Sequence, residues 1–161
     1  MPLQTIVTWL MTLTMSLASP VIACPAPMAD PERPLAITQA TEIRSQVAYE
    51  RLVHNRGITL QWLWSDNLGR LQVTNLVGFV SLAGSQVNQH GAVHLQGDVV
   101  SIDNKGFAFR GTILIEDAPE PGRRCERTGD FYFKASGTRR FWRLQQMQSC
   151  DHFTDYVDIY Y

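Results

Sequence analysis

Charged side chains are missing from the first 23 residues, and the whole 161-residue chain has only three cysteines. The 14 basic and 15 acidic residues that follow nearly cancel, so no overall charge favours binding to nucleic acid or to an anionic membrane. The remaining 138 residues (161 − 23) are enough for one hydrophobic core and too few for two ordinary domains. A hydrophobic fraction of 45% excludes a disordered chain. The composition predicts one globular domain behind an uncharged leader, with no nucleic-acid partner.

No apolar run is long enough to cross a membrane as a helix. Residues 6–18 form an uncharged, mostly apolar stretch of 13 residues, whereas a hydrocarbon core of about 30 Å requires roughly 20. Its length and position are typical of the core of a secretory signal peptide. The next segment, Val21-Ile22-Ala23-Cys24, resembles the lipobox of bacterial lipoproteins. The resemblance implies cleavage before Cys24 and acylation of its thiol.

Two alternatives stay open for this leader. Val21 and Ala23 also suit ordinary signal-peptidase cleavage, which would release a soluble secreted protein with an unmodified Cys24. The leader could also stay uncleaved as an anchor. Residues 1–5 contain neither Lys nor Arg, which departs from both cleavage patterns.

A proline-rich segment follows the leader. Residues 24–36 contain four prolines, which favour an extended tether that cannot pack a core. We therefore expect a signal peptide at 1–23, a Pro-rich tether at 24–36 and a single β-domain at 37–161.

The β-domain is predicted to begin with one helix. Apolar residues recur at three- and four-residue steps between Ile37 and Arg56, a helical pattern that Thr38 or Thr41 can cap and Gly57 can end. After Gly57 the hydrophobic period changes to two, which indicates strands.

Turn residues divide the remaining sequence into short strands. Asp-Asn-x-Gly occurs at 66–69 and 103–106, which predicts two hairpins with a left-handed glycine. Shorter strands are expected at 78–82 and 92–96, around a polar loop at 84–91. The predicted fold class is all-β with one N-terminal helix, arranged as a small antiparallel meander barrel; a two-sheet sandwich is the alternative.

The last hairpin allows its register to be predicted. A two-residue turn at Gly137-Thr138 pairs positions whose numbers sum to 275, so Phe131 faces Leu144. The same sum places Cys125 opposite Cys150. Lipidation of Cys24 would leave these two cysteines to form a disulfide in an oxidising compartment.

The sequence contains no motif of an enzyme or of a metal site. His90 and His94 are four residues apart, but their surroundings predict a loop that runs into a strand, so they would not share a metal ion. We therefore predict no metal, no cofactor and no catalytic residue. The alternative is a cell-wall-directed hydrolase whose acids are brought together only by folding. Those dispersed acids would be Asp98, Asp103, Glu116 and Asp117.

Arginine is concentrated around the last hairpin. Residues 105–143 contain nine basic and five acidic residues, whereas residues 145–161 contain three aspartates and neither Lys nor Arg. We predict that an anionic ligand or a protein binds a surface around the turn, formed by Arg139, Arg140, Trp142 and Arg143. The alternative is that the acidic C-terminal segment neutralises these arginines within an ordinary polar surface.

Two resemblances come from the last forty residues. Four motifs look like a group of uncharacterised exported bacterial proteins with no known activity: Gly122-Arg123-Arg124-Cys125, residues 139–144, Cys150-Asp151 and residues 154–160. Separately, residues 135–139 are similar to a five-residue stretch of periplasmic inhibitors of c-type lysozyme, small barrels that are often lipoproteins and carry a disulfide. That resemblance implies that Ser136 enters a lysozyme cleft. The downstream lysine of those inhibitors has no counterpart, because no Lys follows Lys134.

These features predict an exported protein of the Gram-negative periplasm, anchored in the membrane through lipidated Cys24. Its β-domain is expected to act as a non-enzymatic binding or interaction module. The expected partners are the membrane, reached through the anchor, and an envelope or host protein. The sequence leaves the oligomeric state open.

Overall fold

A computed structural model describes residues 39–63, 65–148 and 150–161. The predicted signal peptide and tether, with Cys24, lie outside these residues. One helix and nine strands occur in the described part of the chain, in this order: β1 (Glu42–Ile43), α1 (Gln46–Val53), β2 (Gly57–Leu60), β3 (Arg70–Leu76), β4 (Phe79–Asn88), β5 (Gly91–Asp103), β6 (Gly106–Glu116), β7 (Arg124–Ala135), β8 (Phe141–Leu144) and β9 (Val157–Tyr160).

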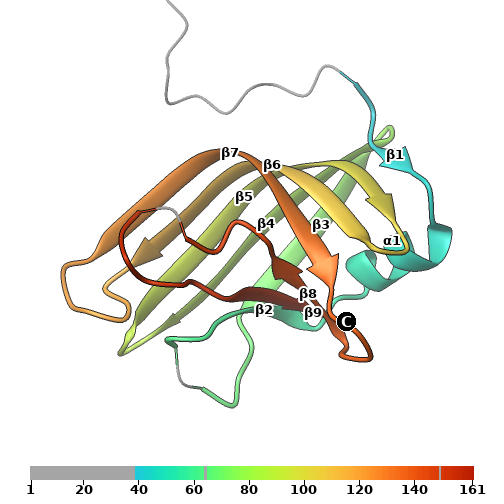
Figure 1. The fold of residues 1–161 in the computed structure, drawn as a ribbon. Coiled ribbons are helices and arrows are strands. Elements are labelled where there is room, and N and C mark those ends of the chain that lie inside the picture. Colours follow the sequence, from blue (N-terminus) through green and yellow to red (C-terminus); the bar gives the residue numbers. More distant parts are fainter. Residues whose placement is uncertain (1–38, 64, 149) are drawn as a thin grey trace, which may run out of the picture.

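The strands form a single sheet that curls into a nearly closed barrel (Figure 1). Its order is β2-β9-β8-β7-β6-β5-β4-β3, and every pair on this path is antiparallel. β1 pairs in parallel with the part of β5 that extends past β4. The predicted meander barrel with one N-terminal helix is thus confirmed, and the two-sheet sandwich is wrong.

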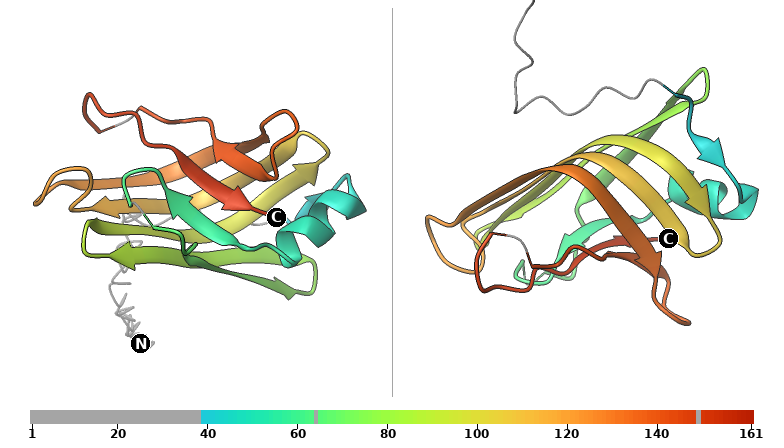
Figure 2. Two further views of the ribbon diagram at one scale, coloured as in Figure 1. Left: turned by 90° about the horizontal axis from the view of Figure 1, so that it is seen from below. Right: turned by 45° about the horizontal axis from the view of Figure 1, so that its top comes forward.

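The barrel has two ends that differ in what covers them. Because neighbouring strands are antiparallel, the β3–β4 tip, the β5–β6 turn and the β7–β8 loop all lie at one end. We call this the α1 end, since α1 lies beside it (Figure 2). The β4–β5 turn and the β6–β7 loop lie at the opposite end, which we call the disulfide end.

The barrel nearly closes where β2 meets the residue before β3. Ile58 and Gly69 exchange two backbone hydrogen bonds, at 3.1 and 2.8 Å. A Cβ on Gly57 would lie 2.0 Å from the carbonyl oxygen of Gly69, so the close approach requires glycine. The hairpin predicted around 66–69 is wrong over most of its length, because β2 ends at Leu60 and the single described bridge between the two arms joins Ile58 to Gly69. The full-length partner of β2 is β9.

Aromatic side chains fill much of the core. Phe107 and Phe133 are fully buried, and their rings stack with centroids 4.9 Å apart. The ring of Trp142 meets Phe107 edge-on at 5.5 Å. Ala48 and Leu52 of α1 join the same core, which fixes the helix against the barrel.

The helix is shorter than predicted. It begins after Ser45, whose hydroxyl accepts a hydrogen bond from the Ala48 N–H, and it ends at Val53. Thr41 does not cap it, because the Thr41 hydroxyl donates to the carbonyl of Val99 at 2.7 Å. The residues before Ser45 form β1 instead of a first helical turn.

The middle strands are longer than predicted. The expected loop at 84–91 is strand as far as Asn88, where a short turn leads into β5. The hairpin at 103–106 is confirmed, although the φ of Gly106 is +158°, close to extended rather than left-handed. The Asp103 carboxylate shapes this turn by accepting hydrogen bonds from the N–H groups of Lys105 and Gly106.

The last hairpin has the predicted turn and a shifted register. The Arg139 N–H donates to the Ser136 carbonyl at 3.0 Å, which places residues 137 and 138 at the centre of the turn. Phe133, and not Phe131, faces Leu144. Paired numbers therefore sum to 277, because two additional residues lie on the return side of the loop. A shift of two residues keeps each side chain on its face, so the apolar face still points into the core.

Candidate functional site

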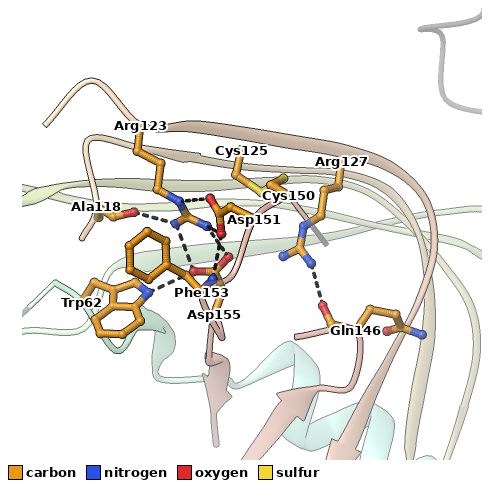
Figure 3. The surroundings of a disulfide bond; sticks show 10 residues. All are labelled: Trp62, Ala118, Arg123, Cys125, Arg127, Gln146, Cys150, Asp151, Phe153 and Asp155. Atoms are coloured by element: carbon orange, nitrogen blue, oxygen red, sulfur yellow. Dashed lines mark hydrogen bonds and ion pairs between the residues drawn. A yellow bond between two sulfur atoms is a disulfide. The ribbon is translucent and has the colours of Figure 1, made fainter. Parts of the chain in front are cut away.

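A disulfide and an ion-pair cluster hold the disulfide end of the barrel (Figure 3). Cys125 of β7 and Cys150 form the predicted disulfide, with Cα atoms 5.7 Å apart. Beside it, the Arg123 guanidinium donates to the carboxylates of Asp151 and Asp155, each at 2.8 Å. The side chains of Arg123 and Asp155 are only 7% and 1% exposed, so this is a buried ion pair.

The groups of this cluster satisfy one another. Burial opposes the charge on Arg123, but the hydrogen bonds to Asp155 and Asp151 outweigh it and raise the pKa of the guanidinium. Arg123 also donates to the carbonyl of Ala118, and Asp155 accepts a hydrogen bond from the Trp62 indole N–H at 2.9 Å. We call these five residues the Arg123 cluster. It joins three separate segments of the chain, so we interpret it as a structural clasp.

A buried arginine lies behind the disulfide. Arg127 points from β7 into the barrel, where its Nη1 donates to the Gln146 carbonyl at 2.6 Å (Figure 3). Burial lowers the pKa of this guanidinium. Arg127 therefore contributes to the polar part of the interior between the disulfide and the aromatic core.

The acids of the predicted hydrolase are not brought together. Glu116 and Asp117 line an open pocket of about 530 Å³ beside Trp62 and His90. Asp98 lines a different pocket, and Asp103 binds backbone amides in the β5–β6 turn. Within the described ranges, no three His, Cys, Asp or Glu side chains gather in a way that could hold a metal ion.

The α1 end carries a basic pocket of about 480 Å³. Its lining includes Arg51 of α1 and Arg139 and Arg140 of the β7–β8 loop, all exposed, together with Tyr161. None of the described residues that line it is acidic. We call these three arginines and Tyr161 the basic pocket.

The C-terminal segment positions the basic pocket. The Tyr161 N–H donates to the Arg140 carbonyl at 3.1 Å, and the Tyr161 ring packs on Trp142 with centroids 4.2 Å apart. The guanidinium of Arg51 lies 5.2 Å from the centroid of the Tyr161 ring. Tyr161 thus holds the helix and the hairpin loop side by side.

Two of the four predicted binding residues do not belong to this pocket. Trp142 is 2% exposed and packs in the core, so the prediction that it contacts a ligand is wrong. Arg143 forms a bidentate pair with Asp158 of β9, at 2.8 and 2.7 Å, and its guanidinium lies 4.2 Å over the Tyr156 ring. The hydrogen bond to Asp158 raises the pKa of Arg143. Neutralisation by the acidic C-terminal segment, the predicted alternative, describes Arg143 correctly.

Sequence analysis missed Arg51 and Tyr161 as part of this site. Arg51 lies in the last turn of α1, far along the chain from the hairpin, so no spacing pattern connects them. Tyr161 follows directly after the motif at residues 154–160 and was assigned no role. No sequence signal places either residue beside Arg139 and Arg140, because these segments come together only when the barrel folds.

The described residues define the class of protein: a small antiparallel β-barrel domain, clasped by a disulfide and an ion-pair cluster, with an open basic pocket. The chain belongs to the PM1083 family, whose match covers residues 40–161. A relative from Pasteurella multocida (strain Pm70), "Uncharacterized protein PM1083", is 34% identical over 113 residues, 69% of this chain and 74% of the relative. No solved structure gives a significant match.

These comparisons confirm the resemblance to a group of uncharacterised bacterial proteins. The similarity to inhibitors of c-type lysozyme finds no support in them. Among the described residues, no helix combines the length and the apolar character needed to cross a bilayer.

Proposed function

We propose that this chain is an exported protein of the bacterial envelope, anchored in the periplasm through lipidated Cys24, and that its β-domain binds a partner without catalysing a reaction. The uncharged leader and the lipobox-like Val21-Ile22-Ala23-Cys24 support export and anchoring. The disulfide supports an oxidising compartment. The basic pocket supports a role in binding.

Three arginines, Arg51, Arg139 and Arg140, surround one open pocket, and none of the described residues that line it is acidic. This arrangement is the main support for a binding role. Arginine presents a planar set of donors that matches a carboxylate or phosphate. The guanidinium groups of Arg123 and Arg143 already bind aspartates, whereas the three arginines of the basic pocket are exposed. We infer that the partner is an envelope protein that places an anionic group between these arginines.

A capture experiment tests the binding role. The intact protein is cross-linked in envelope extracts, and the captured proteins are compared with those of an Arg139→Ala/Arg140→Ala variant. The control is Arg110→Ala/Arg124→Ala, which removes the same charge from two arginines outside the pocket. Capture by the wild type and the control, with loss in the pocket variant and at high salt, supports the proposal. Equal capture by all three proteins, or no capture by the wild type, contradicts it.

Mass spectrometry tests the anchor. Protein from a bacterial host is expected to begin at an acylated Cys24, and Cys24→Ser is expected to move it from the membrane to the soluble fraction. An unmodified N-terminus on soluble wild-type protein would show that the anchor is absent and would favour plain secretion.

We do not propose the cell-wall hydrolase. Its four candidate acids lie in three places, and each is already engaged: Glu116 by Arg124, Asp98 by the Ser81 hydroxyl, and Asp103 and Asp117 by backbone amides. A carboxylate pair for glycoside hydrolysis requires two acids that flank one bond.

A further inference from the structure

The β3–β4 hairpin ends in an exposed apolar tip. Leu76, Val77 and Phe79 are 68%, 96% and 39% exposed, and residues 75–80 contain no charge. Single exposed apolar residues are common on protein surfaces, but here three of them share one protruding turn. We call these three residues the apolar tip.

The backbone of the apolar tip adds a second observation. Val77 has a φ of +51°, in the left-handed region that a β-branched residue rarely adopts. Asparagine or glycine would suit this position better, both for the backbone and for solvent. The turn is nevertheless well formed, since the Asn75 side chain accepts a hydrogen bond from the Gly78 N–H at 3.0 Å. A fully exposed valine therefore stands where folding alone favours another residue.

The N-terminal segment enters the domain at this tip. The Thr41 N–H donates to the Gly78 carbonyl at 2.9 Å, and the Thr41 hydroxyl accepts from the Val80 N–H at 3.0 Å. Figure 1 shows β1, which begins at Glu42, beside the end of this hairpin. The described chain therefore begins beside the apolar tip, and Cys24 precedes this point in the sequence.

The length of the preceding segment limits how far the tip can lie from the anchor. Thr41 lies 17 positions after Cys24 (41 − 24), and a proline-rich chain at about 3.1 Å per residue spans about 50 Å over that length. An acylated Cys24 would therefore keep the apolar tip within about 50 Å of a bilayer surface.

We propose that the apolar tip inserts into the interface of the membrane that holds acylated Cys24. This inference rests on the proposed lipid anchor, because the anchor makes the bilayer the nearest apolar phase. The uncharged tip enters that phase without burying a charge. Ile43 of β1, 38% exposed, follows two residues after Thr41 and would rest near the surface. The acyl chains on Cys24 and the inserted apolar tip would together orient the barrel with its β3–β4 hairpin end toward the membrane.

A matched pair of labelled variants tests this contact. Val77→Cys and Val87→Cys each place one free thiol on the same hairpin, where Val87 is 65% exposed and close to the β4–β5 turn at the disulfide end. Cys125 and Cys150 are joined to each other, and the anchor would occupy Cys24. Each variant is labelled with a polarity-sensitive dye and reconstituted in vesicles of phosphatidylethanolamine and phosphatidylglycerol. We expect a blue shift of the emission, and quenching by brominated lipid, at position 77 and neither at position 87.

Additional experiments distinguish membrane insertion of the tip from the effect of the lipid anchor and from docking to a protein. The same two labels are placed on the Cys24→Ser chain, which is titrated with the same vesicles. A blue shift specific to position 77 in either preparation supports the tip. Emission that is equal at positions 77 and 87 in both preparations overturns it, even where mass spectrometry finds acylated Cys24. A shift at position 77 that needs envelope proteins and is absent with pure lipid also overturns it, in favour of protein docking.

One variant separates membrane contact from folding. Val77→Asn retains the left-handed turn, since asparagine tolerates this conformation, and removes the most exposed side chain of the apolar tip. We expect an unchanged or higher midpoint of thermal unfolding together with weaker quenching of a label at position 76, introduced as Leu76→Cys. If the label at position 76 is quenched as strongly with asparagine at position 77 as with the native Val77, the proposal is contradicted.

Discussion

Arg123 and Asp155 form a bidentate ion pair across 32 positions of the chain, with Nη1–Oδ1 at 3.0 Å and Nη2–Oδ2 at 2.8 Å. The Asp155 carboxylate also accepts the indole N–H of Trp62. One nearly inaccessible carboxylate therefore links the loop after β2, the residue before β7 and the segment before β9. A buried ion pair contributes little net stability, because burying the two charges costs about as much as their attraction returns. The loss of one partner nevertheless destabilises the fold, because it leaves the other charge buried without a counter-ion.

Removal of Arg123 is therefore expected to destabilise the domain strongly. Arg123→Met should lower the free energy of unfolding by about 3–5 kcal/mol, because Asp155 would stay buried without its counter-ion. Urea unfolding followed by tryptophan fluorescence measures the change. Arg124→Met is the matched control, since the Arg124 side chain is 55% exposed and its surface pairs should contribute at most about 1 kcal/mol. Equal losses in the two variants would contradict the role of the buried pair.

The ion pair between Asp151 and Arg123 should make the stability of the domain depend on pH. The Arg123 guanidinium holds the pKa of Asp151 below its ordinary value, so the folded state binds this proton less readily than the unfolded state does. The stabilisation is therefore complete above the unfolded pKa of about 3.9 and is lost as the pH falls through the lower, folded pKa. Unfolding in urea between about pH 6 and 2 should show this loss. Asp151→Asn should flatten the acid limb; an unchanged limb would contradict the assignment.

The disulfide yields a third prediction. Cys125 and Cys150 are 25 positions apart, and closure of a loop of this length restricts the unfolded chain by up to about 3.5 kcal/mol. Cys125→Ala/Cys150→Ala should lose stability of this order, whereas Cys24→Ser should lose none. Nonreducing peptide mapping should recover one linked species, and two free thiols in protein from the periplasm would contradict the pairing.

Local features of this fold were predictable from sequence. The β5–β6 hairpin and the turn at 137–138 depend on residues next to each other in the chain, and both were placed correctly. The disulfide was found by counting cysteines. The predicted strand alignment gave the same pair, although the true register differs by two and Cys150 lies outside the strands.

Contacts between distant segments were not predictable in the same way. β2 pairs with β9, which lies at the other end of the domain sequence, and no residue between Leu60 and Arg70 indicates that partner. The curl of the sheet then brings β2 to Gly69, just before β3, at the opposite edge. The basic pocket has the same origin, since Arg51 reaches Arg139 and Arg140 only through the packing of α1 against Tyr161. Charge composition did contain one useful signal. The basic hairpin and the acidic C-terminal segment indicated neutralisation, which Arg123 and Arg143 show.

The arginines of the last hairpin should divide into one that stabilises the fold and two that do not. Arg143 binds Asp158, whose side chain is 7% exposed, so Arg143→Ala should lower the free energy of unfolding by about 2 kcal/mol. Arg139→Ala and Arg140→Ala change exposed side chains in the turn and should stay within about 0.5 kcal/mol of the wild type.

Two measurements on the same three variants make this division testable. Urea unfolding should single out Arg143→Ala, and cross-linking in envelope extracts should single out Arg139→Ala and Arg140→Ala. Asp158→Asn offers a check, because it removes the charge that Arg143 binds and leaves the basic pocket untouched. It should resemble Arg143→Ala in stability and the wild type in capture. If Arg139→Ala or Arg140→Ala destabilises the domain as much as Arg143→Ala, these arginines support the hairpin and the basic pocket is not a binding site.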